Sequence, residues 1–311
     1  MASGRFAPSP TGALHVGNLR TALAAWLFAR SSGGRFVVRM EDLDRVTSSR
    51  EHERSQLADL AALGVDNDGP VVRQSDRFDI YREAIDLLTR AGLTYRCYCT
   101  RREIREAAAA PHGAAQPDGA YPGTCRELTE RERAAREAEG RRPALRLRVE
   151  PGTTVRVLDR LCGAVEGVVD DVVLCRNDGV PAYNLAVVVD DAAQGIDEVV
   201  RGDDLLLSAP RQVHLQRLLG LPTPVYAHVP LVVGPDGQRL AKRHGAVTLA
   251  DLAAHGWTAA GVLGVLAGSL GLVAGGAPAR TAADLLDHFD PTRVPREPWR
   301  VEPAVTFARP R

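Results

Sequence analysis

The 311-residue sequence contains a single lysine, Lys242, among 39 basic residues, so the other 38 are arginines. Acidic residues also number 39, and the formal net charge at pH 7 is zero. General binding of polyanions relies on excess positive charge, so any contact with nucleic acid must be local. In a chain that otherwise uses arginine, one lysine indicates a position that needs a compact ammonium group on a flexible stem.

The sequence also lacks an apolar segment at its start, because residues 1–12 are polar and rich in proline. This composition argues against a secretory signal peptide. The longest uncharged stretch, residues 256–278, is long enough to cross a bilayer but is crowded with glycine and alanine, so we interpret it as a buried helix. We therefore expect a cytoplasmic protein without membrane contact. Cysteines of cytosolic proteins are more often metal ligands or core residues than parts of disulfides, and we expect the same of the five cysteines here.

The first 94 residues predict the start of a parallel α/β sheet. Residues 5–10 have the pattern of a short strand that runs into a turn, helical spacing of apolar residues begins at Ala13, and residues 35–41 are rich in β-forming types. In parallel sheets, ligands bind beyond the carboxyl ends of the strands. The opening turn and Glu41 are therefore expected to face the same crevice.

The composition changes at Tyr95 and divides the chain into four predicted segments. Residues 1–94 and 186–248 are the two halves of a catalytic domain, 95–185 an insertion between them, and 249–311 a C-terminal helical segment. The apolar runs 185–191, 198–204 and 225–233 are predicted to be strands, and 208–219 a helix. Cys162 and Cys175 fall in apolar, strand-like runs and are expected in the core.

Two segments have the composition of a phosphate site. The tetrapeptide His15-Val16-Gly17-Asn18 opens the first predicted helix, and helix N-termini attract anions through free amides and positive potential. The loop G-P-D-G-Q-R-L-A-K-R-H-G, residues 234–245, contains the lysine. A basic loop opposite a helix N-terminus suits phosphoryl or nucleotidyl transfer. Taken singly, a buried structural histidine and a solvated basic loop would produce the same patterns.

Four motifs in this order resemble those of class I glutamyl-tRNA synthetases. R-F-A-P-S-P-T-G-A-L-H-V-G-N (5–18) is similar to the signature with the "HIGH" tetrapeptide, R-M-E-D-L-D (39–44) to the acidic strand end, V-V-R-G-D-D-L-L (199–206) to the second-half signature, and R-L-A-K-R (239–243) to the "KMSKS" loop. The resemblance covers roughly the whole chain. It implies an α/β fold with a Rossmann-type parallel sheet, an inserted zinc-containing subdomain and a C-terminal helical segment.

The resemblance also implies ATP-dependent activation of L-glutamate, with Mg²⁺ accompanying the ATP. Residues at matching positions for glutamate are Arg5, Ala7 (through its backbone), Ser9, Glu41, Tyr183 and Arg201, and those for ATP are His15, Gly17, Asn18 and Lys242. His15 and Lys242 are the candidate catalytic residues, because they would stabilise charge on the phosphates. Arginine binds a carboxylate with two parallel hydrogen bonds. Which arginine binds which glutamate carboxylate remains open.

The chain is shorter than ordinary glutamyl-tRNA synthetases, which continue into a helical anticodon-binding domain, and we expect no such domain here. This outline is similar to that of the glutamyl-queuosine tRNA(Asp) synthetases, which attach glutamate to queuosine in the anticodon of tRNA(Asp). The resemblance implies tRNA-independent activation, tRNA(Asp) bearing queuosine as partner, and a monomer. Two alternatives remain: a truncated enzyme that charges a tRNA 3′ end, and a non-catalytic paralogue that binds glutamate or tRNA.

Within the predicted insertion, Cys97, Cys99, Tyr121 and Cys125 match the zinc pattern of that branch, C-x-C followed by Y-x-x-x-C. Three thiolates suit a tetrahedral zinc site, whereas a tyrosine ligand rests on the resemblance alone. The chain departs from the family in the basic loop, where Arg239 replaces the usual lysine and Ala241 the usual serine. These departures leave the turnover rate open.

Overall fold

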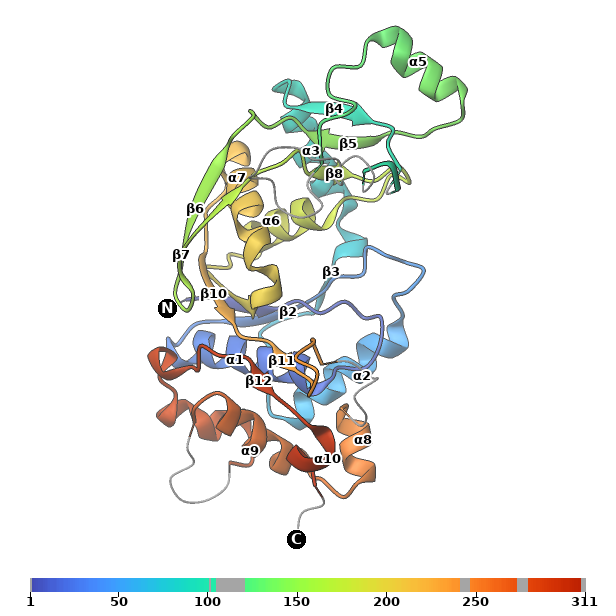
Figure 1. The fold of residues 1–311 in the computed structure, drawn as a ribbon. Helices are drawn as coiled ribbons and strands as arrows, with labels where there is room; N and C mark the ends of the chain where they lie inside the picture. Colours follow the sequence, from blue (N-terminus) through green and yellow to red (C-terminus); the bar gives the residue numbers. More distant parts are fainter. Residues whose placement is uncertain (1, 101, 105–120, 241–246, 273–278, 309–311) are drawn as a thin grey trace.

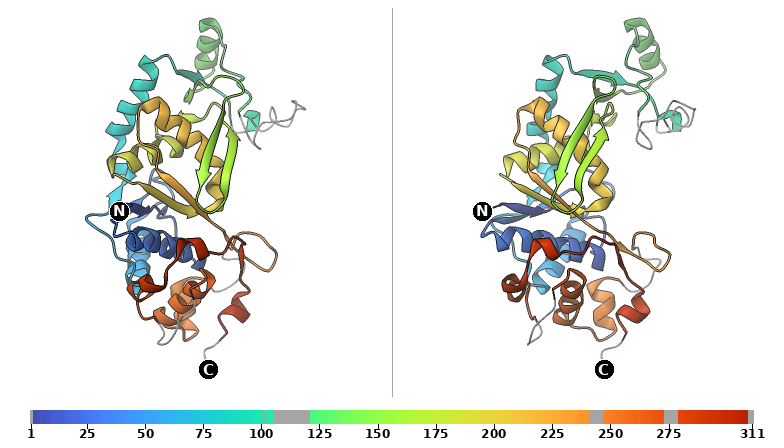
Figure 2. Two further views of the ribbon diagram at one scale, coloured as in Figure 1. Left: turned by 90° about the vertical axis from the view of Figure 1, so that its left-hand side faces the viewer. Right: turned by 60° about the vertical axis from the view of Figure 1, so that its left-hand side comes forward.

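The computed structural model describes residues 2–100, 102–104, 121–240, 247–272 and 279–308. Helix α5 (Glu130–Ala138) lies at one end of the molecule, and the C-terminal helices lie at the opposite end, as all views agree (Figures 1 and 2). Between these ends lie parallel strands with helices packed on them. The arrangement confirms the α/β fold with a parallel sheet.

The parallel strands form two sets that meet at the middle of the molecule. One set is β1 (Gly4–Phe6), β2 (Phe36–Met40) and β3 (Val72–Arg73); the other is β9 (Glu198–Gly202), β10 (Val225–Val229) and β6 (Thr154–Asp159), with β7 (Gly163–Val168) antiparallel on β6. The sets adjoin at β1 and β9, because the Ser3 carbonyl accepts hydrogen bonds from the amides of Asp197 and Glu198 at 2.9 and 3.1 Å. Both sets therefore end at one crevice.

Helix α1 (Val16–Ser31) is buried on nearly all sides, because it packs on β1 and β9 with one face and on C-terminal helix α9 with another (Figure 1). This explains its composition, since a helix that is apolar all round belongs in a core. Other helices are α2 (Arg50–Ala62), α3 (Phe78–Arg90), α6 (Tyr183–Ala193), α7 (Ala209–Leu219), α8 (Leu249–Ala254), α9 (Ala259–Ser269) and α10 (Pro303–Thr306).

A separate small sheet lies near α5 and consists of the antiparallel strands β4 (Thr94–Cys97), β5 (Ala144–Leu147) and β8 (Val173–Cys175) (Figure 1). A cluster of buried tyrosine and cysteine side chains includes Tyr95 and Cys97 of β4, whereas Leu147 of β5 and Leu174 of β8 belong to a larger core cluster. At the other end, β11 (Val232–Val233) pairs in parallel with β12 (Trp299–Arg300), a strand inside the segment predicted to be helical. Short 3₁₀ turns span Gln74–Asp76, Asp203–Ser208, Ala282–His288 and Pro291–Arg293.

The predicted strand 185–191 is wrong, because these residues lie inside helix α6. Leu185, Ala186, Val187 and Val188 are all buried, which removes the alternation that distinguishes a half-exposed strand. A continuous apolar run does not distinguish a buried strand from a buried helix. The helix instead packs against α3, α7 and β8.

Other predicted boundaries also change. Helix α1 begins at Val16 rather than Ala13, and the predicted strand 225–233 divides into β10 and β11 at Pro230, whose nitrogen has no hydrogen to donate. Cys162 is exposed in the turn between β6 and β7 rather than buried, and Cys175 is half-buried.

The predicted buried helix 256–278 corresponds to α9, which ends before Gly271, where φ is +80°. Its last six residues, 273–278, lie outside the described residues. No helix among the described residues is long and apolar enough to cross a membrane.

Candidate active site

A cavity of about 570 Å³ opens beyond the ends of β1 and β9, at the N-terminus of α1. Every described residue that the sequence assigned to glutamate or ATP lines this cavity: Arg5, Ala7, Ser9, His15, Gly17, Asn18, Glu41, Tyr183 and Arg201. Arg239 lines it as well, whereas Lys242 and Ala241 lie outside the described residues. The structure brings these positions together; the role of each side chain remains a prediction.

His15 is the N-cap of α1, and its ring is held by the backbone. Its Nδ1 accepts hydrogen bonds from the amides of Gly17 and Asn18 at 3.1 and 3.3 Å, and the Asn18 side chain accepts one from the His15 amide. A Cβ atom on Gly17 would lie 2.9 Å from the ring, so a larger residue there would have to displace the His15 side chain. Because Nδ1 accepts, the proton of the neutral ring is on Nε2 and is available for donation.

Burial, together with the nearby Arg239 guanidinium, lowers the pKa of His15 to about 4. The ring is therefore neutral near pH 7. A neutral Nε2–H group at a helix N-terminus can donate to a phosphate oxygen without carrying a full charge of its own.

Arg5 and Glu41 belong to a buried network of charges that the sequence analysis missed. Asp191 Oδ1 lies 3.3 Å from Arg5 Nε and 2.7 Å from Arg39 Nη1, and Glu41 Oε1 lies 3.5 Å from Arg39 Nη2. Arg5 also donates to the carbonyl of Val200 at 3.3 Å. Burial raises the pKa of Glu41, although Arg39 and Arg5 oppose the rise. Burial would raise the pKa of Asp191 too, but Arg39 and Arg5 outweigh it and lower this pKa.

A second acid, Asp190, supports the same network from α6. It accepts hydrogen bonds from Gln74, Arg77 and Tyr81 at 2.9, 2.7 and 2.8 Å. The adjacent pair Asp190-Asp191 at the end of an apolar run was a signal for these residues, since acids are seldom fully buried unless paired.

Arg201 differs from Arg5 because its partners are neutral. Its Nε donates to His228 Nε2 at 2.9 Å, its Nη1 to Gln212 at 2.7 Å and its Nη2 to the Leu205 carbonyl at 3.2 Å. The residue is only 4% exposed, and within the described part of the chain no carboxylate forms an ion pair with it. A guanidinium has five N–H donors, so two remain. Arg201 is thus a buried cation whose charge a bound anion would compensate.

A second cavity, of about 1000 Å³, adjoins the first and shares Ser9, Glu41 and Tyr183 with it. It extends to Cys97 and Cys99 and is lined by the arginines Arg141, Arg142, Arg146 and Arg176. Burial raises the pKa of Tyr183 to about 12, so its phenol is neutral where the cavities meet. The lining also contains the acids Glu41 and Asp44, and Arg141 and Arg176 form ion pairs with Glu103 and Asp178. With four arginines against two acids, the lining is positive on balance and suits an anionic ligand.

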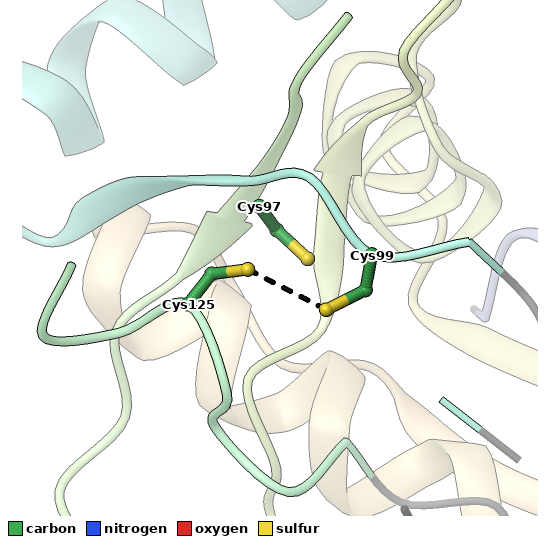
Figure 3. A group of neighbouring side chains, drawn as sticks. All are labelled: Cys97, Cys99 and Cys125. Atoms are coloured by element: carbon green, nitrogen blue, oxygen red, sulfur yellow. Dashed lines mark hydrogen bonds between the residues drawn. The ribbon is translucent and has the colours of Figure 1, made fainter. Parts of the chain in front are cut away.

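The cysteines Cys97, Cys99 and Cys125 form a cluster in which all sulfur atoms lie within 4.8 Å of one another. Figure 3 shows their sulfur atoms turned toward a common point. The Sγ atoms of Cys99 and Cys125 lie 3.4 Å apart. The Tyr121 hydroxyl lies 3.3 Å from Cys97 Sγ and 3.6 Å from Cys99 Sγ. Hydrogen bonds from Cys125 and Cys99 lower the pKa of Cys97, which favours its thiolate. The cluster could hold a metal ion, as three convergent sulfur ligands commonly do.

Comparison with known proteins gives a consistent result. Residues 2–266 match the protein family described as "tRNA synthetases class I (E and Q), catalytic domain". The chain is 63% identical to a glutamyl-Q tRNA(Asp) synthetase of Nocardia farcinica (strain IFM 10152), over 96% of this chain and 92% of that one. It is 49% identical to a glutamyl-Q tRNA(Asp) synthetase of Symbiobacterium thermophilum, over 99% and 98% of the two chains.

Among solved structures, a glutamate tRNA ligase from Elizabethkingia meningosepticum, in complex with its amino acid, superposes with a TM-score of 0.79 at 27% identity. The match covers 96% of this chain but 66% of the ligase. The similarity therefore extends over nearly all of the present chain and about two thirds of a longer protein.

Proposed function

The chain belongs to the family of class I tRNA synthetases for glutamate and glutamine, a family of ligases, and from this premise we propose which reaction it catalyses. It activates glutamate with ATP, without tRNA, and transfers the glutamyl group to queuosine in the anticodon of tRNA(Asp). The observation that carries the activation step is one cavity that holds both a histidine donor at a helix N-terminus and a buried arginine that has no acidic partner among the described residues. The proposed acceptor is supported by the names of two relatives that match over nearly their full length.

Glutamate has two carboxylates and one ammonium group. Arg201 binds one carboxylate with its two remaining N–H donors, because its charge is otherwise uncompensated. Arg5 offers a weaker second site, since Asp191 already shares its charge. Glu41 binds the ammonium group, assisted by the Ala7 carbonyl and Ser9, and Tyr183 closes the pocket.

ATP lies against the N-terminus of α1, where Gly17 and Asn18 border the cavity. An oxygen of the glutamate α-carboxylate attacks the α-phosphorus, the bond from phosphorus to the bridging oxygen breaks, and pyrophosphate leaves with that electron pair. His15 donates from Nε2 to a phosphate oxygen as charge develops. Lys242 supplies a positive charge to the phosphates through its compact ammonium group. Mg²⁺ bound to the phosphates would neutralise part of their charge.

The acceptor approaches from the second cavity, whose arginines suit the phosphates of a nucleotide. Its hydroxyl oxygen attacks the glutamyl carbonyl carbon, the bond to the AMP oxygen breaks, and the hydroxyl proton leaves to AMP or water. The alternative acceptor is a tRNA 3′ end, which the similarity to a glutamate tRNA ligase favours. A cytoplasmic location and a monomeric state stay predictions.

For activation, we expect purified protein to exchange radiolabelled pyrophosphate into ATP when L-glutamate is present and tRNA is absent. L-Glutamine is expected to give no exchange, because it lacks the second carboxylate that Arg201 or Arg5 would bind. Exchange that requires tRNA would instead favour the tRNA-charging alternative. Absence of exchange under every condition would overturn the activation proposal.

The acceptor is tested with tRNA(Asp) from which the 3′-terminal adenosine has been removed. Transfer of labelled glutamate to this tRNA is expected when it carries queuosine and not when it carries unmodified guanosine. Transfer only to intact tRNA, regardless of queuosine, would favour the 3′ end.

We propose that the cysteine cluster holds one Zn²⁺ ion, with Tyr121 as the fourth ligand. Such an ion would connect the end of β4 to residues 121–125 and thereby stabilise this subdomain. Arg146, whose guanidinium lies 3.7 Å from the centre of the Tyr121 ring, packs over the site.

The substitution Cys99→Ser is expected to reduce the zinc content from about one ion per chain to near zero and to lower the melting temperature. The matched control is Cys162→Ser, because Cys162 is exposed and outside the cluster. Metal analysis by mass spectrometry and thermal melts measure both effects. Equal zinc content in the two variants would contradict the proposed site.

A further inference from the structure

His228, in β10, is a fully buried histidine that contacts Arg201 from the side away from the predicted substrate. Its Nε2 accepts the Arg201 Nε–H at 2.9 Å, and its Nδ1 lies 2.6 Å from Asp159 Oδ2 at the end of β6. Three parallel strands, β6, β10 and β9, thus supply one connected row of polar side chains. Neither Asp159 nor His228 lines the cavity.

The chemistry of the partners determines where the proton of His228 lies. A guanidinium N–H can only donate, so Nε2 must accept and carries no proton. The remaining proton is on Nδ1 and is donated to Asp159. The ring in this arrangement is therefore neutral, with one defined tautomer.

Asp159 is itself held in place as an acceptor. Its Oδ1 accepts the amides of Leu161, Cys162 and His228 at 2.9, 2.8 and 3.2 Å. Burial would raise its pKa, but the hydrogen bonds from His228 and from these amides outweigh burial and lower it. Asp159 thus remains a carboxylate that orients the imidazole.

Charged and aromatic groups surround His228 on the neighbouring elements. They are Asp159 (β6), Arg201 (β9), Arg5 (β1), Asp203 (the 3₁₀ turn after β9) and Tyr226 (β10), whose ring stacks on the imidazole with centroids 5.9 Å apart. Burial lowers the pKa of His228, and Arg201 and Arg5 lower it further, whereas Asp159 opposes them. The ring is accordingly neutral at pH 7.

We propose that His228 is a positioning residue for Arg201, in which the neutral imidazole, oriented by Asp159, directs the guanidinium toward a glutamate carboxylate, and that protonation of His228 weakens glutamate binding. This inference rests on the proposed function, since it takes Arg201 as the carboxylate ligand. A proton on His228 Nε2 would place this N–H group against the Arg201 Nε–H group. It would also put a second positive charge beside Arg201.

A neutral histidine can orient Arg201 without neutralising its positive charge, whereas an acid cannot. An aspartate or glutamate in contact with Arg201 would compensate its charge and compete with the substrate carboxylate. The imidazole accepts the same hydrogen bond without a negative charge, and the carboxylate of Asp159 lies one residue further from the cavity. Arg201 is therefore oriented and still electrostatically available.

The direction of the pH effect follows from the lowered pKa. Because the pKa of His228 lies below the ordinary histidine value of 6.5, the neutral ring predominates at and above pH 6.5, and the protonated form becomes dominant only at a lower pH. The KM for glutamate is therefore expected to be constant from pH 7 to 8 and to rise as the pH falls through the pKa of His228. The KM for ATP has no such dependence on this group.

The test uses ATP–pyrophosphate exchange by the full-length protein between pH 5 and 8, with KM for glutamate, KM for ATP and kcat measured separately. His228→Ala is expected to raise the KM for glutamate about 10- to 100-fold at pH 7.5, the range for losing a hydrogen bond to a charged group, with the KM for ATP unchanged.

His228→Gln keeps a hydrogen-bond acceptor for Arg201 that does not titrate. It should restore much of the affinity and remove the rise at acid pH. Asp159→Asn should raise the KM for glutamate less than His228→Ala.

The matched control is His214→Gln, because His214 is a half-buried histidine of α7 outside both cavities. Thermal melts establish that each variant is folded. If His228→Ala does not fold, the glutamate KM values of His228→Gln and Asp159→Asn test the inference instead. An unchanged KM for glutamate, an equal rise of both KM values, or an acid rise that persists in His228→Gln would overturn the inference while leaving glutamate activation intact. Wild-type protein without glutamate-dependent exchange would overturn the proposed function and this inference together.

Discussion

Replacing Arg201 with alanine is expected to lower kcat/KM for glutamate roughly 30- to 4,000-fold. This range corresponds to about 2 to 5 kcal/mol, the effect of truncating one partner of a buried, hydrogen-bonded charge pair. The expectation rests on the absence of an acidic partner for Arg201 among the described residues, which leaves the substrate to compensate its charge. The KM for ATP should change little, because the proposed ATP site lies at the N-terminus of α1.

Arg201→Lys is expected to lie between alanine and wild type. Lysine keeps the positive charge, but its compact ammonium lacks the planar fork that contacts His228, Gln212 and Leu205 while also binding a carboxylate. Arg82→Ala is the matched control, since Arg82 is exposed on α3 and forms an ion pair with Asp79 on the same helix. Steady-state exchange kinetics measure all three. A glutamate KM in Arg201→Ala equal to that of wild type would rule out Arg201 as the carboxylate ligand.

Replacing His15 with asparagine is expected to lower kcat about 10²- to 10³-fold, the usual effect of removing one hydrogen-bond donor to the developing charge. This variant separates two roles of the residue. Asparagine is a preferred N-cap and can accept from the Gly17 and Asn18 amides as the imidazole does, but it lacks the donor at Nε2. His15→Asn should therefore be nearly as stable as wild type and much slower.

His15→Ala should lose the donor and the cap together, with a similar loss of kcat and a loss of stability of about 1 kcal/mol. His255→Asn is the control, because His255 is an exposed histidine at the end of α8. Because the pKa of His15 is near 4, no titration of this residue is expected between pH 6 and 8. Exchange rates and denaturant unfolding measure the two effects, and a kcat for His15→Asn close to wild type would exclude His15 as the donor.

Much of the active site was predictable because its residues lie in short motifs at the ends of strands. Arg5 lies in β1 and Ala7 directly follows it, Glu41 directly follows β2, and Arg201 is the second-last residue of β9; all of them line one cavity. Parallel strands have their carboxyl ends at one edge, so residues at those ends meet whatever their separation in sequence. The cysteine cluster was predicted from the resemblance to the family's zinc pattern, and the fold brings Cys125 next to Cys97 and Cys99 although it lies far from them in the sequence.

The residues that support these groups were not predictable from local patterns. Asp191 contacts both Arg5 and Arg39, and no periodicity in the sequence relates these three positions. The run that precedes Asp191 was predicted to be a strand and is helix α6, because burial on all sides removes the pattern that separates the two structures. That difference matters to the site, since the helix directs Asp190 and Asp191 into the charge network.

The sequence by itself determined the family resemblance, the parallel α/β class and the set of residues that gather at the cavity, because these depend on short motifs and on the geometry common to all parallel sheets. The tertiary structure alone decided which of two buried arginines has no acidic partner in the described part of the chain. It did so by placing Asp191 beside Arg5 and His228 beside Arg201. Charge compensation depends on distances of a few ångströms between residues far apart in the chain, and such distances are set only when the strands and helices pack.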